Sequence, residues 1–478
     1  MESNTSIPLC VDLDGTIIRS DLLIESFLLL IKSKPFYLFY LPLWLYKGKA
    51  YLKEQIAARV DLDASLLPYQ HELIKFLKEE ESAGRTLYLV TAAHESLAKK
   101  ISKQLGFFKE VFATSGSTNL AGQKKLSILL KKFGEKGFDY VGNSSDDLIV
   151  WKHSRHSILV NPDIGIQKKA KKLSTIENTF EDKESFFSNF LSAIRIHQWL
   201  KNLLLFAPLL AAHITIDFFV VFKAVSAFIA FGLCASSVYI LNDLLDLKSD
   251  RQHPNKRNRV FAAGKMPIKY GILLAPSLFV FSIILSLLSS PLSFLSVLLT
   301  YYALTLLYSF WARNRVIVDV LFLAILYTMR ILAGSAAFQI LPSFWLLAFS
   351  MFIFLSLALV KRYSEISIMK RIQGTSISGR SYIPSDLPIL QSLGTASGYI
   401  SVLVLALYIN SREVNLLYNT PQILWLICPL LLFWISWVWI KSHRGEMTDD
   451  PVLFAIKDKV SRIVFALTAT VIYTASWF

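Results

Sequence analysis

Three acidic and five basic residues lie close together in NDLLDLKSDRQHPNKRNR, residues 242–259. Asp243, Asp246 and Asp250 are three and four residues apart, so a helix continuing past Leu241 would carry all three on one face. Crowded carboxylates repel each other, and Mg²⁺ would relieve this because it prefers oxygen ligands, including diphosphate oxygens. A solvated helix end is the alternative. We predict a magnesium and phosphate site made of acids with a neighbouring amide (Asn242, Asp243, Asp246 and Asp250) and of bases (Arg251, His253, Lys256, Arg257 and Arg259).

These residues follow an apolar segment, and the C-terminal part of the chain contains many such segments. We predict an all-α polytopic domain of about nine transmembrane helices, at 199–214, 218–241, 270–289, 291–310, 317–337, 343–360, 395–410, 422–440 and 460–478. The loops at 242–269, 311–316, 361–394 and 441–459 hold nearly all Lys and Arg of the loops, which favours a cytoplasmic location for them. We therefore expect a multi-pass protein of the inner (cytoplasmic) membrane, with its N-terminal domain in the cytoplasm and its C-terminus on the opposite side.

The composition agrees with a membrane protein. The chain has 478 residues, of which 54% are hydrophobic and 18% charged, which is unusual for a large soluble enzyme. The excess of 50 Lys and Arg over 35 Asp and Glu suits loops beside anionic lipid and phosphate-bearing substrates, so we expect no nucleic-acid partner. Cys10, Cys234 and Cys428 lie in apolar surroundings without metal-ligand spacing and are predicted to be packing residues.

The string NDLLDLKSD resembles the NDxxDxxxD signature of the UbiA prenyltransferase superfamily, at the end of the second span where that superfamily carries it. HPNKRNRVFAAGKM, with Val260 in place of a Pro, resembles the branch that contains decaprenyl-phosphate phosphoribosyltransferase. RIHQWLKN, with Lys201 and Asn202, also resembles that branch. The resemblance implies a nine-helix enzyme that holds a diphosphate donor through Mg²⁺ between two polar motifs.

The second polar motif follows the fourth predicted span. It resembles a YSxxxK...D...R pattern in which Arg313 replaces Lys, and it implies site roles for Tyr308, Arg313, Asp319 and Arg330. An internal structural ion pair is the alternative for Asp319 and Arg330. Lys361, Arg362 and Glu365 also resemble that branch, which implies that they anchor a second phosphate; a helix-end charge cluster is the alternative. Asp449, Asp450 and Asp458 are family-like acids whose role stays open.

A different motif opens the chain. LCVDLDGTIIRSD, residues 9–21, begins as an apolar strand and breaks at DLDGT, which resembles the first motif of haloacid dehalogenase-like phosphatases. The later motifs follow in order: Thr91 ends LYLVT, Lys125 or Lys124 follows, and VGNSSDD has Asn143 in place of an acid. The resemblance implies an α/β Rossmann-like domain at 1–165 with a small helical cap at about 20–85, a linker or interfacial segment at 166–194, and the membrane transferase domain at 195–478.

The same resemblance implies the roles of the phosphatase residues. Asp12 would attack phosphorus and form an aspartyl-phosphate, and Asp14 would act as acid and base. Asp12, the Asp14 carbonyl and Asp147, with Asp146 as an alternative, would bind Mg²⁺. Because Asn143 removes one carboxylate, an inactive domain is the other interpretation.

The insertion between the first two motifs contains FYLFYLPLWLY, which is too short to span a bilayer and is interrupted by Pro42. Its aromatic residues fit either the core of the cap or a segment that dips into the lipid headgroups.

Together, the two halves suggest a bifunctional enzyme. The membrane half would transfer a 5-phosphoribosyl group from phosphoribosyl diphosphate to a polyprenyl phosphate, and the N-terminal half would remove the 5-phosphate of the product. The alternative is prenyl transfer from a polyprenyl diphosphate to an aromatic or other small acceptor, with an independent phosphatase; an ion-coordinating transporter or lipid-binding protein is a third possibility. Lipid chain length and oligomeric state stay open.

Overall fold

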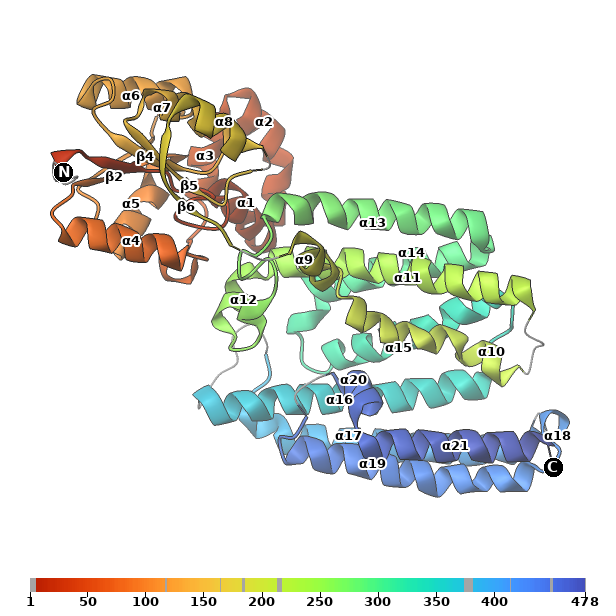
Figure 1. Cartoon of the computed structure of the whole chain (residues 1–478). Coiled ribbons are helices and arrows are strands. Elements are labelled where there is room, and N and C mark those ends of the chain that lie inside the picture. Colours follow the sequence, from red (N-terminus) through yellow and green to blue (C-terminus); the bar gives the residue numbers. More distant parts are fainter. Residues whose placement is uncertain are drawn as a thin grey trace. The chain divides into compact units, whose positions relative to one another are not determined.

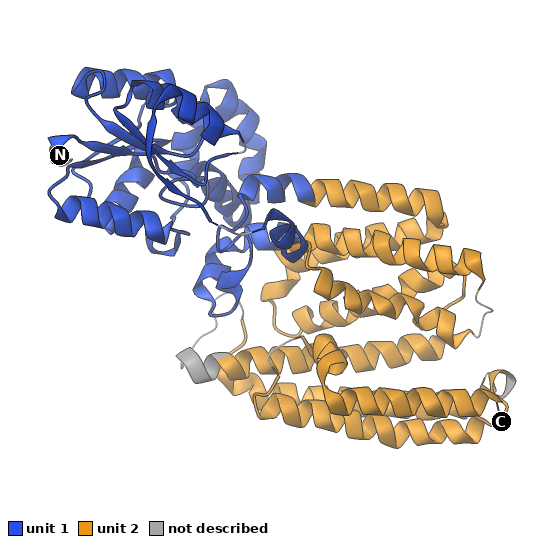
Figure 2. Cartoon of the chain, viewed as in Figure 1, with its two compact units in different colours: residues 1–193, 240–274 blue, residues 194–239, 275–478 orange. Residues whose placement is uncertain are grey.

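The computed structural model describes residues 6–116, 118–163, 165–182, 185–212, 217–373, 381–412, 414–447 and 450–477. The chain forms two compact units, which Figure 2 colours separately. Unit 1 comprises residues 1–193 and 240–274, and unit 2 comprises residues 194–239 and 275–478. Unit 1 therefore contains both the DLDGT motif and the stretch with the three aspartates.

Unit 1 is built on a parallel six-stranded sheet in the order β3-β2-β1-β4-β5-β6 (Figure 1). In this order the connections change direction between the neighbouring strands β1 and β4, and such a switch point leaves a crevice at the carboxyl ends of the strands. The strands are β1 (Leu9–Val11), β2 (Leu87–His94), β3 (Glu110–Thr114), β4 (Asp139–Gly142), β5 (His156–Val160) and β6 (Thr175–Phe180). The α/β fold with a parallel sheet is confirmed, and it is compatible with a haloacid dehalogenase-like domain.

Helices cover both faces of this sheet, which explains why β1 is apolar at every position. Leu9 and Val11 pack with residues of α4 (His71–Ser82) and α5 (Glu95–Leu105). Cys10 points to the other face and packs with residues of α6 (Gln123–Phe133), α7 (Leu148–His153) and α8 (Ile166–Leu173). Cys234 and Cys428 are buried as well, as expected of packing residues.

The segment predicted as a linker, 166–194, has regular structure. It contains α8, β6 and α9 (Phe186–Ala193), and β6 pairs in parallel with β5 from His156↔Thr175 to Val160↔Phe180. Ile176 packs against the hydrophobic core that contains Cys10, whereas the neighbouring polar residues of β6 are exposed. Because most residues of this strand are polar, its sequence resembles that of a polar linker.

The cap lies between β1 and β2. It consists of α1 (Leu22–Ser33), the 3₁₀ helix η2 (Pro35–Tyr40), α2 (Leu41–Tyr46), α3 (Lys49–Ala57) and the 3₁₀ turn η3 (Ala64–Leu66), and α4 then returns the chain to the sheet. Leu30, Trp44 and Ile56 form its small core. Phe36, Phe39 and Tyr46 are 78%, 81% and 90% exposed, so only part of the aromatic segment serves as cap core.

In the membrane part, the regular structure of the described residues is entirely helical. Eight helices there are long and apolar enough to cross a bilayer: α11 (Phe218–Leu245), α13 (Ile268–Ser289), α14 (Leu292–Phe310), α15 (Val318–Phe338), α16 (Phe344–Gln373), α17 (Leu387–Ile409), α19 (Ile427–His443) and α21 (Lys459–Trp477). The span predicted at 199–214 instead begins as the 3₁₀ helix η5 (Ile196–Phe206) and continues as α10 (Ala207–Ala211). Pro208 accounts for this break, because it cannot donate a backbone hydrogen bond to an extended helix.

The helix of the first acidic motif extends past the predicted end of its span. α11 reaches Leu245 and is followed, after Asp246, by the short helix α12 (Leu247–Gln252). The Asp246 amide donates to Asn242 O at 2.9 Å and the Asp250 amide to Asp246 O at 2.8 Å, so the helical path is almost unbroken. The three aspartates are therefore carried on consecutive turns, as their spacing predicts.

Candidate active sites

The first site lies at the carboxyl ends of β1 and β4. These strands are parallel neighbours, and the Asp12 amide donates to Val141 O at 3.0 Å. Asp12 follows the last residue of β1, and Asp147 lies in the 3₁₀ turn η4 (Ser145–Asp147) that follows β4. The sheet topology thus brings together two carboxylates that are far apart in sequence.

Lys125 joins these two carboxylates. Its Nζ lies 3.0 Å from Asp12 Oδ1 and 3.5 Å from Asp147 Oδ1, and all three side chains are buried. Lys124 is exposed, which decides between the two lysines in favour of Lys125. Burial raises the pKa of Asp12 to about 6, although Lys125 opposes that shift.

Asp147 is held by a ring of donors. The amides of Asn143 and Ser144 each donate to its Oδ2 at 3.0 Å, and the Tyr140 hydroxyl donates to its Oδ1 at 2.9 Å. Asp146 is exposed, so Asp147 is the better placed of the two acids. Tyr140 was not predicted, because a tyrosine in a buried strand gives no sign that it faces a site.

Asp14 is fixed by the start of α1. Its Oδ1 accepts a hydrogen bond from the Leu22 amide at 2.9 Å. Burial raises the pKa of Asp14 well above its ordinary value, and the nearby Asp21 adds to the effect. A protonated carboxyl is what donation of a proton to a leaving group requires.

Asn143 stands where the resemblance expects an acid, and its surroundings fit it closely. Its Oδ1 accepts from the Thr16 hydroxyl at 3.3 Å. Gly15 has φ +74°, and a Cβ there would come within 2.3 Å of Asn143 Nδ2. Only glycine therefore allows the DLDGT turn to approach this side chain.

Two further residues, Thr91 and Lys53, come from β2, the strand next to β1, and from the cap. Thr91 is buried in β2, and its Oγ1 accepts from the Ala93 amide at 3.0 Å. Lys53, which comes from α3 in the cap, donates to Ala92 O at 2.6 Å and to Asn119 Oδ1 at 2.8 Å. Burial lowers the pKa of Lys53. No sequence motif indicates a lysine in the cap, and the fold brings Lys53 to the site.

A cavity of about 740 Å³ opens on this site. Asp12, Asp14 and Lys125 line it, together with residues 264, 265 and 267–269. The latter follow the basic motif and lead into α13, so two distant parts of the chain form one cavity within unit 1. The cavity is as large as those that bind small-molecule ligands.

The donor set of this site fits Mg²⁺. Asp12 and Asp147 are buried carboxylates that share the single ammonium of Lys125, and hard oxygen ligands of this kind suit the ion.

The second site contains Asp243, Asp246 and Asp250, where α11 ends and α12 begins, and all three are buried. Arg259 Nη1 lies 3.1 Å from Asp243 Oδ1 and 2.7 Å from Asp250 Oδ2, which brings these two carboxylates together. Burial raises the pKa of Asp250 despite Arg259. Clustered buried carboxylates are again a donor set that fits Mg²⁺.

The other bases of this motif have different surroundings. Arg251 pairs with Glu25, and Lys32 pairs with Asp246. His253 Nδ1 accepts from the Asn255 and Lys256 amides at 3.2 and 3.4 Å, so it shapes the loop. Arg257 is exposed, and Asn242 is half-buried.

In unit 2, Asp450 is the centre of a polar cluster. Its Oδ2 lies 2.8 Å from Lys201 Nζ and 3.0 Å from Lys361 Nζ, and the Tyr327 hydroxyl donates to its Oδ1 at 3.0 Å. Burial would raise the pKa of Asp450, but Lys201 and Lys361 outweigh it and hold the pKa far below its ordinary value. The structure thus assigns a place to Asp450; Asp449 lies outside the described residues.

Asn202 and Arg330 meet in the same unit. Arg330 Nε donates to Asn202 Oδ1 at 3.2 Å, and its Nη2 donates to the Tyr301 hydroxyl at 3.1 Å. Among the residues that the structure describes, the buried Nδ2 of Asn202 has no hydrogen-bond partner. A buried amide donor next to an arginine suits an anionic or carbonyl-bearing ligand.

Asp319 belongs to a third group. Arg362 Nη2 lies 2.5 Å from Asp319 Oδ2, and the Tyr382 hydroxyl donates to Asp319 Oδ1 at 2.6 Å. Arg362 also pairs with Glu365 at 2.5 Å. This fits the structural ion-pair interpretation of Asp319, with Arg362 as the partner in place of Arg330. Tyr308 and Arg313, the remaining members of the motif, are half-buried.

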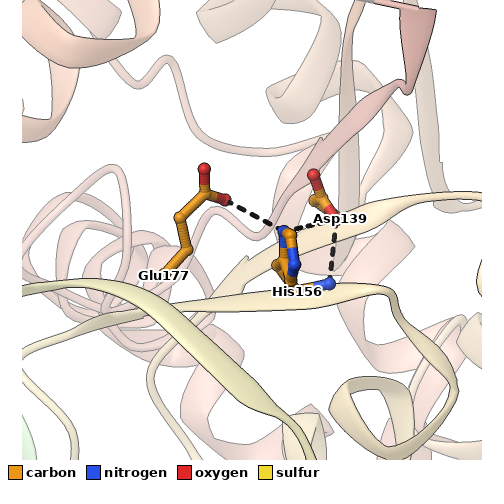
Figure 3. A group of neighbouring side chains, drawn as sticks. All are labelled: Asp139, His156 and Glu177. Atoms are coloured by element: carbon orange, nitrogen blue, oxygen red, sulfur yellow. Dashed lines mark hydrogen bonds and ion pairs between the residues drawn. The ribbon is translucent and has the colours of Figure 1, made fainter. Parts of the chain in front are cut away.

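Asp139, His156 and Glu177 form another group with the residue types of a metal site (Figure 3). Asp139 begins β4, so it lies at the end of the sheet opposite to Asp12. Its carboxylate pairs with Arg85 and, at 2.5 Å, with Arg155, and it accepts from the His156 amide at 2.8 Å. The arginines already neutralise this carboxylate, so we interpret the group as structural.

Comparison with known proteins assigns the membrane part. The model of the UbiA prenyltransferase family matches residues 203–461. The chain belongs to the UbiA prenyltransferase family. The match includes the acids of α11 and α12 as well as Asp319, Lys361 and Asp450.

Relatives of this UbiA protein differ in how much of the chain they match. Protein y4nM of Sinorhizobium fredii is 38% identical over 97% of this chain and 90% of its own length. Nodulation protein NoeC of Azorhizobium caulinodans is 33% identical over 58% of this chain and 90% of its own length. The decaprenyl-phosphate phosphoribosyltransferase of Mycolicibacterium smegmatis is 32% identical over 62% of this chain and 94% of its own length.

A solved structure of a UbiA homologue from Archaeoglobus fulgidus, bound to DMAPP and Mg²⁺, aligns with 60% of the chain and 99% of its own length at 17% identity and a TM-score of 0.46. The family assignment therefore rests on the sequence matches.

Proposed function

We propose that this UbiA-family protein transfers a 5-phosphoribosyl group from phosphoribosyl diphosphate to a polyprenyl phosphate, and that its N-terminal domain removes the 5-phosphate of the product. The observation that carries this proposal is the cavity at Asp12 and Lys125, which is also lined by residues 264, 265 and 267–269. These residues begin five positions after Arg259, the last base of the transferase motif. A phosphomonoesterase cavity next to a site that would generate a phosphomonoester supports consecutive reactions.

In the transfer step, the bond between ribose C1 and the diphosphate breaks, and an oxygen of the polyprenyl phosphate bonds to C1. Bound Mg²⁺, held by Asp243, Asp246 and Asp250, would neutralise charge on the departing diphosphate. The bases around these acids would add to this neutralisation and orient the diphosphate. In unit 2, Lys201, Asn202 and Lys361 would bind an anionic group.

In the hydrolytic step, an Asp12 oxygen attacks the 5-phosphate phosphorus, and the sugar oxygen leaves with the proton of Asp14. Asp14, now ionised, takes a proton from the water that hydrolyses the aspartyl-phosphate. Lys125 balances the charge of Asp12 during both steps, and Thr91 would hold a phosphoryl oxygen. Mg²⁺ at Asp12 and Asp147 would stabilise the charge on that group.

The location that fits both reactions is the inner membrane, with the N-terminal domain in the cytoplasm. Phosphoribosyl diphosphate is a soluble metabolite, and the basic loops of the chain favour the cytoplasmic face for this site.

A second candidate is prenyl transfer from a polyprenyl diphosphate to an aromatic or other small acceptor. The name of the matching family favours it. In this case the same acids would hold the diphosphate of the lipid, and the phosphatase domain would act on an unrelated phosphomonoester.

One assay distinguishes the two candidates. Purified full-length protein is incubated with Mg²⁺, labelled phosphoribosyl diphosphate and a polyprenyl phosphate, and the lipids are extracted. We expect label in the lipid fraction with the wild type and with the control Asp61→Asn, whose side chain is exposed, but not with Asp243→Asn. Turnover of a prenyl diphosphate without label transfer would refute the first candidate.

The phosphatase step has its own readout. Asp12→Asn should let the phosphorylated lipid accumulate, whereas the wild type should release inorganic phosphate. An unchanged product ratio would count against a coupled phosphatase.

A further inference from the structure

Helix α1 of the cap contacts both candidate sites of unit 1. At its first residue, the Leu22 amide donates to Asp14 Oδ1 at 2.9 Å. Further along, Glu25 pairs with Arg251 and Lys32 pairs with Asp246. Glu25 and Lys32 are seven residues apart and so lie on one face of the helix.

We propose that Glu25 and Lys32 are positioning residues of the transferase site, and that α1 couples diphosphate binding at that site to the phosphatase site. The inference rests on the proposed function in one respect, because it takes Asp246 and Arg251 as part of the diphosphate site. Neither Glu25 nor Lys32 belongs to a motif of either family resemblance.

The contact between Glu25 and Arg251 is a buried two-point pair. Arg251 Nη1 and Nη2 lie 2.8 and 2.7 Å from the two carboxylate oxygens, and Arg251 Nε donates to Ala262 O at 2.9 Å. The side chains are only 5% and 8% exposed. All three guanidinium nitrogens are therefore engaged, and Glu25 fixes the orientation of Arg251 within the motif.

The contact between Lys32 and Asp246 has a different character. The two side chains are 2.7 Å apart, with Asp246 buried and Lys32 41% exposed. Lys32 places a positive charge beside Asp246, just as Arg259 places one beside Asp243 and Asp250. If these acids held Mg²⁺ and, through it, a diphosphate, the ammonium of Lys32 would be free to turn from Asp246 to a diphosphate oxygen.

The start of α1 carries this change to the phosphatase site. The helix has 12 residues, and its N-cap Asp21 accepts from the Ile24 amide at 3.0 Å, so its first turn is well fixed. If α1 shifts at the face with Glu25 and Lys32, its first residue shifts as well. The Leu22 amide, which donates to Asp14, then moves relative to that carboxylate. Coupling of this kind is reciprocal in its effect on binding.

The test uses full-length protein and two readouts. The first is label transfer to lipid, and the second is hydrolysis of the soluble phosphomonoester p-nitrophenyl phosphate with and without inorganic diphosphate and Mg²⁺. For Lys32→Met we expect kcat/KM for the labelled donor to fall about fivefold or more, a typical coupling factor, with most of the change in KM. Lys32→Arg should restore most of this loss, and Lys100→Met, which removes an exposed pair with Asp61, should have no effect.

The coupling itself is tested with the soluble substrate. Inorganic diphosphate should change the rate of hydrolysis by the wild type about fivefold or more. Lys32→Met should keep the basal hydrolysis and lose the response. Because Glu25→Gln leaves a buried arginine without its partner and could unfold the protein, Lys32→Met is the primary variant. The double variant Glu25→Gln/Arg251→Gln should show a non-additive effect on transfer.

Two results would overturn the inference. One is a donor KM for Lys32→Met equal to that of the wild type, and the other is hydrolysis that does not respond to diphosphate. In either case, continued label transfer by the wild type and its loss in Asp243→Asn would leave the proposed function intact. Absence of transfer in every protein would instead contradict the proposed function.

Discussion

Lys125 Nζ lies 3.0 Å from Asp12 Oδ1 and 3.5 Å from Asp147 Oδ1. One ammonium group therefore contacts two buried carboxylates at the crevice between β1 and β4. This arrangement gives Asp12 a defined orientation toward the cavity. It also makes the position of the lysine critical, since its neighbour Lys124 is exposed.

Lys125→Met should abolish most phosphatase activity. Without the ammonium, the buried Asp12 and Asp147 repel each other, and the phosphoryl group loses a charge partner. We expect kcat for a phosphomonoester to fall about 10²-fold or more, a usual loss for one charge-stabilising group. Lys124→Met is the matched control and should retain wild-type activity; equal losses in both variants would contradict the assignment.

Asn143→Asp should tighten magnesium binding at the phosphatase site. The variant adds a carboxylate next to Asp147 in place of an amide that Thr16 contacts. Titration of phosphatase activity with Mg²⁺ should give half-saturation at a concentration about tenfold lower, because an added anionic ligand favours the cation. If the wild type shows no activity at any Mg²⁺ concentration and the variant gains it, the inactive interpretation of the natural domain is correct.

Much of both sites could be predicted because their motifs are local. Asp12 follows an apolar strand, and the three aspartates follow an apolar span at helical spacing, so sequence alone indicates where the chemistry lies. Contacts between distant residues could not be predicted. Lys32 and Asp246 are 214 positions apart, and Glu25 and Arg251 are 226 apart.

Dependence on contacts between distant residues also explains why other features could not be predicted. Asp450 was a family-like acid of open role, and only the fold shows that Lys201 and Lys361 share it. The first span was expected from its apolar residues alone, whereas Pro208 decides how its backbone folds. Strand β6 has so few apolar residues that its place in the sheet follows only from pairing with β5.

Asp450→Asn should abolish transfer while leaving the phosphatase active. The variant leaves Lys201 and Lys361 without the carboxylate between them, so the two ammonium groups repel each other and lose their orientation. We expect label transfer to lipid to fall about 10²-fold or more. Asp458→Asn is the control, because Asp458 Oδ2 accepts from the Ser461 amide at 2.8 Å at the start of α21 and has a capping role. Comparable losses of transfer in both variants would argue against a special role of Asp450.

The exposed aromatic face of η2 and α2 should lie in the lipid headgroups. Phe36, Phe39 and Tyr46 are exposed, and Lys residues at 34, 47 and 49 flank them, as in segments that bind anionic bilayers. A fluorophore attached to a cysteine at position 39 in proteoliposomes should shift to the blue and be quenched by spin-labelled lipid. The same fluorophore at Lys172, an exposed residue of α8, should be quenched little. Equal quenching at the two positions would leave the cap without a membrane contact.

Asp139 should make the stability of the sheet depend on pH. Burial would raise its pKa, but the hydrogen bonds from Arg155 and the His156 amide, with the charge of Arg85, lower it below the ordinary value of 3.8. A carboxylate with a lowered pKa stabilises the fold at pH values above its unfolded pKa, and this stabilisation is lost as the pH falls through the folded pKa. Asp139→Asn should cost about 3 kcal/mol or more at neutral pH, because Arg85 stays buried without its partner. Calorimetry of the full chain should show the gap in melting temperature between wild type and variant narrowing from about pH 5 to about pH 3. A gap that stays constant over this range would show that Asp139 does not act through its charge.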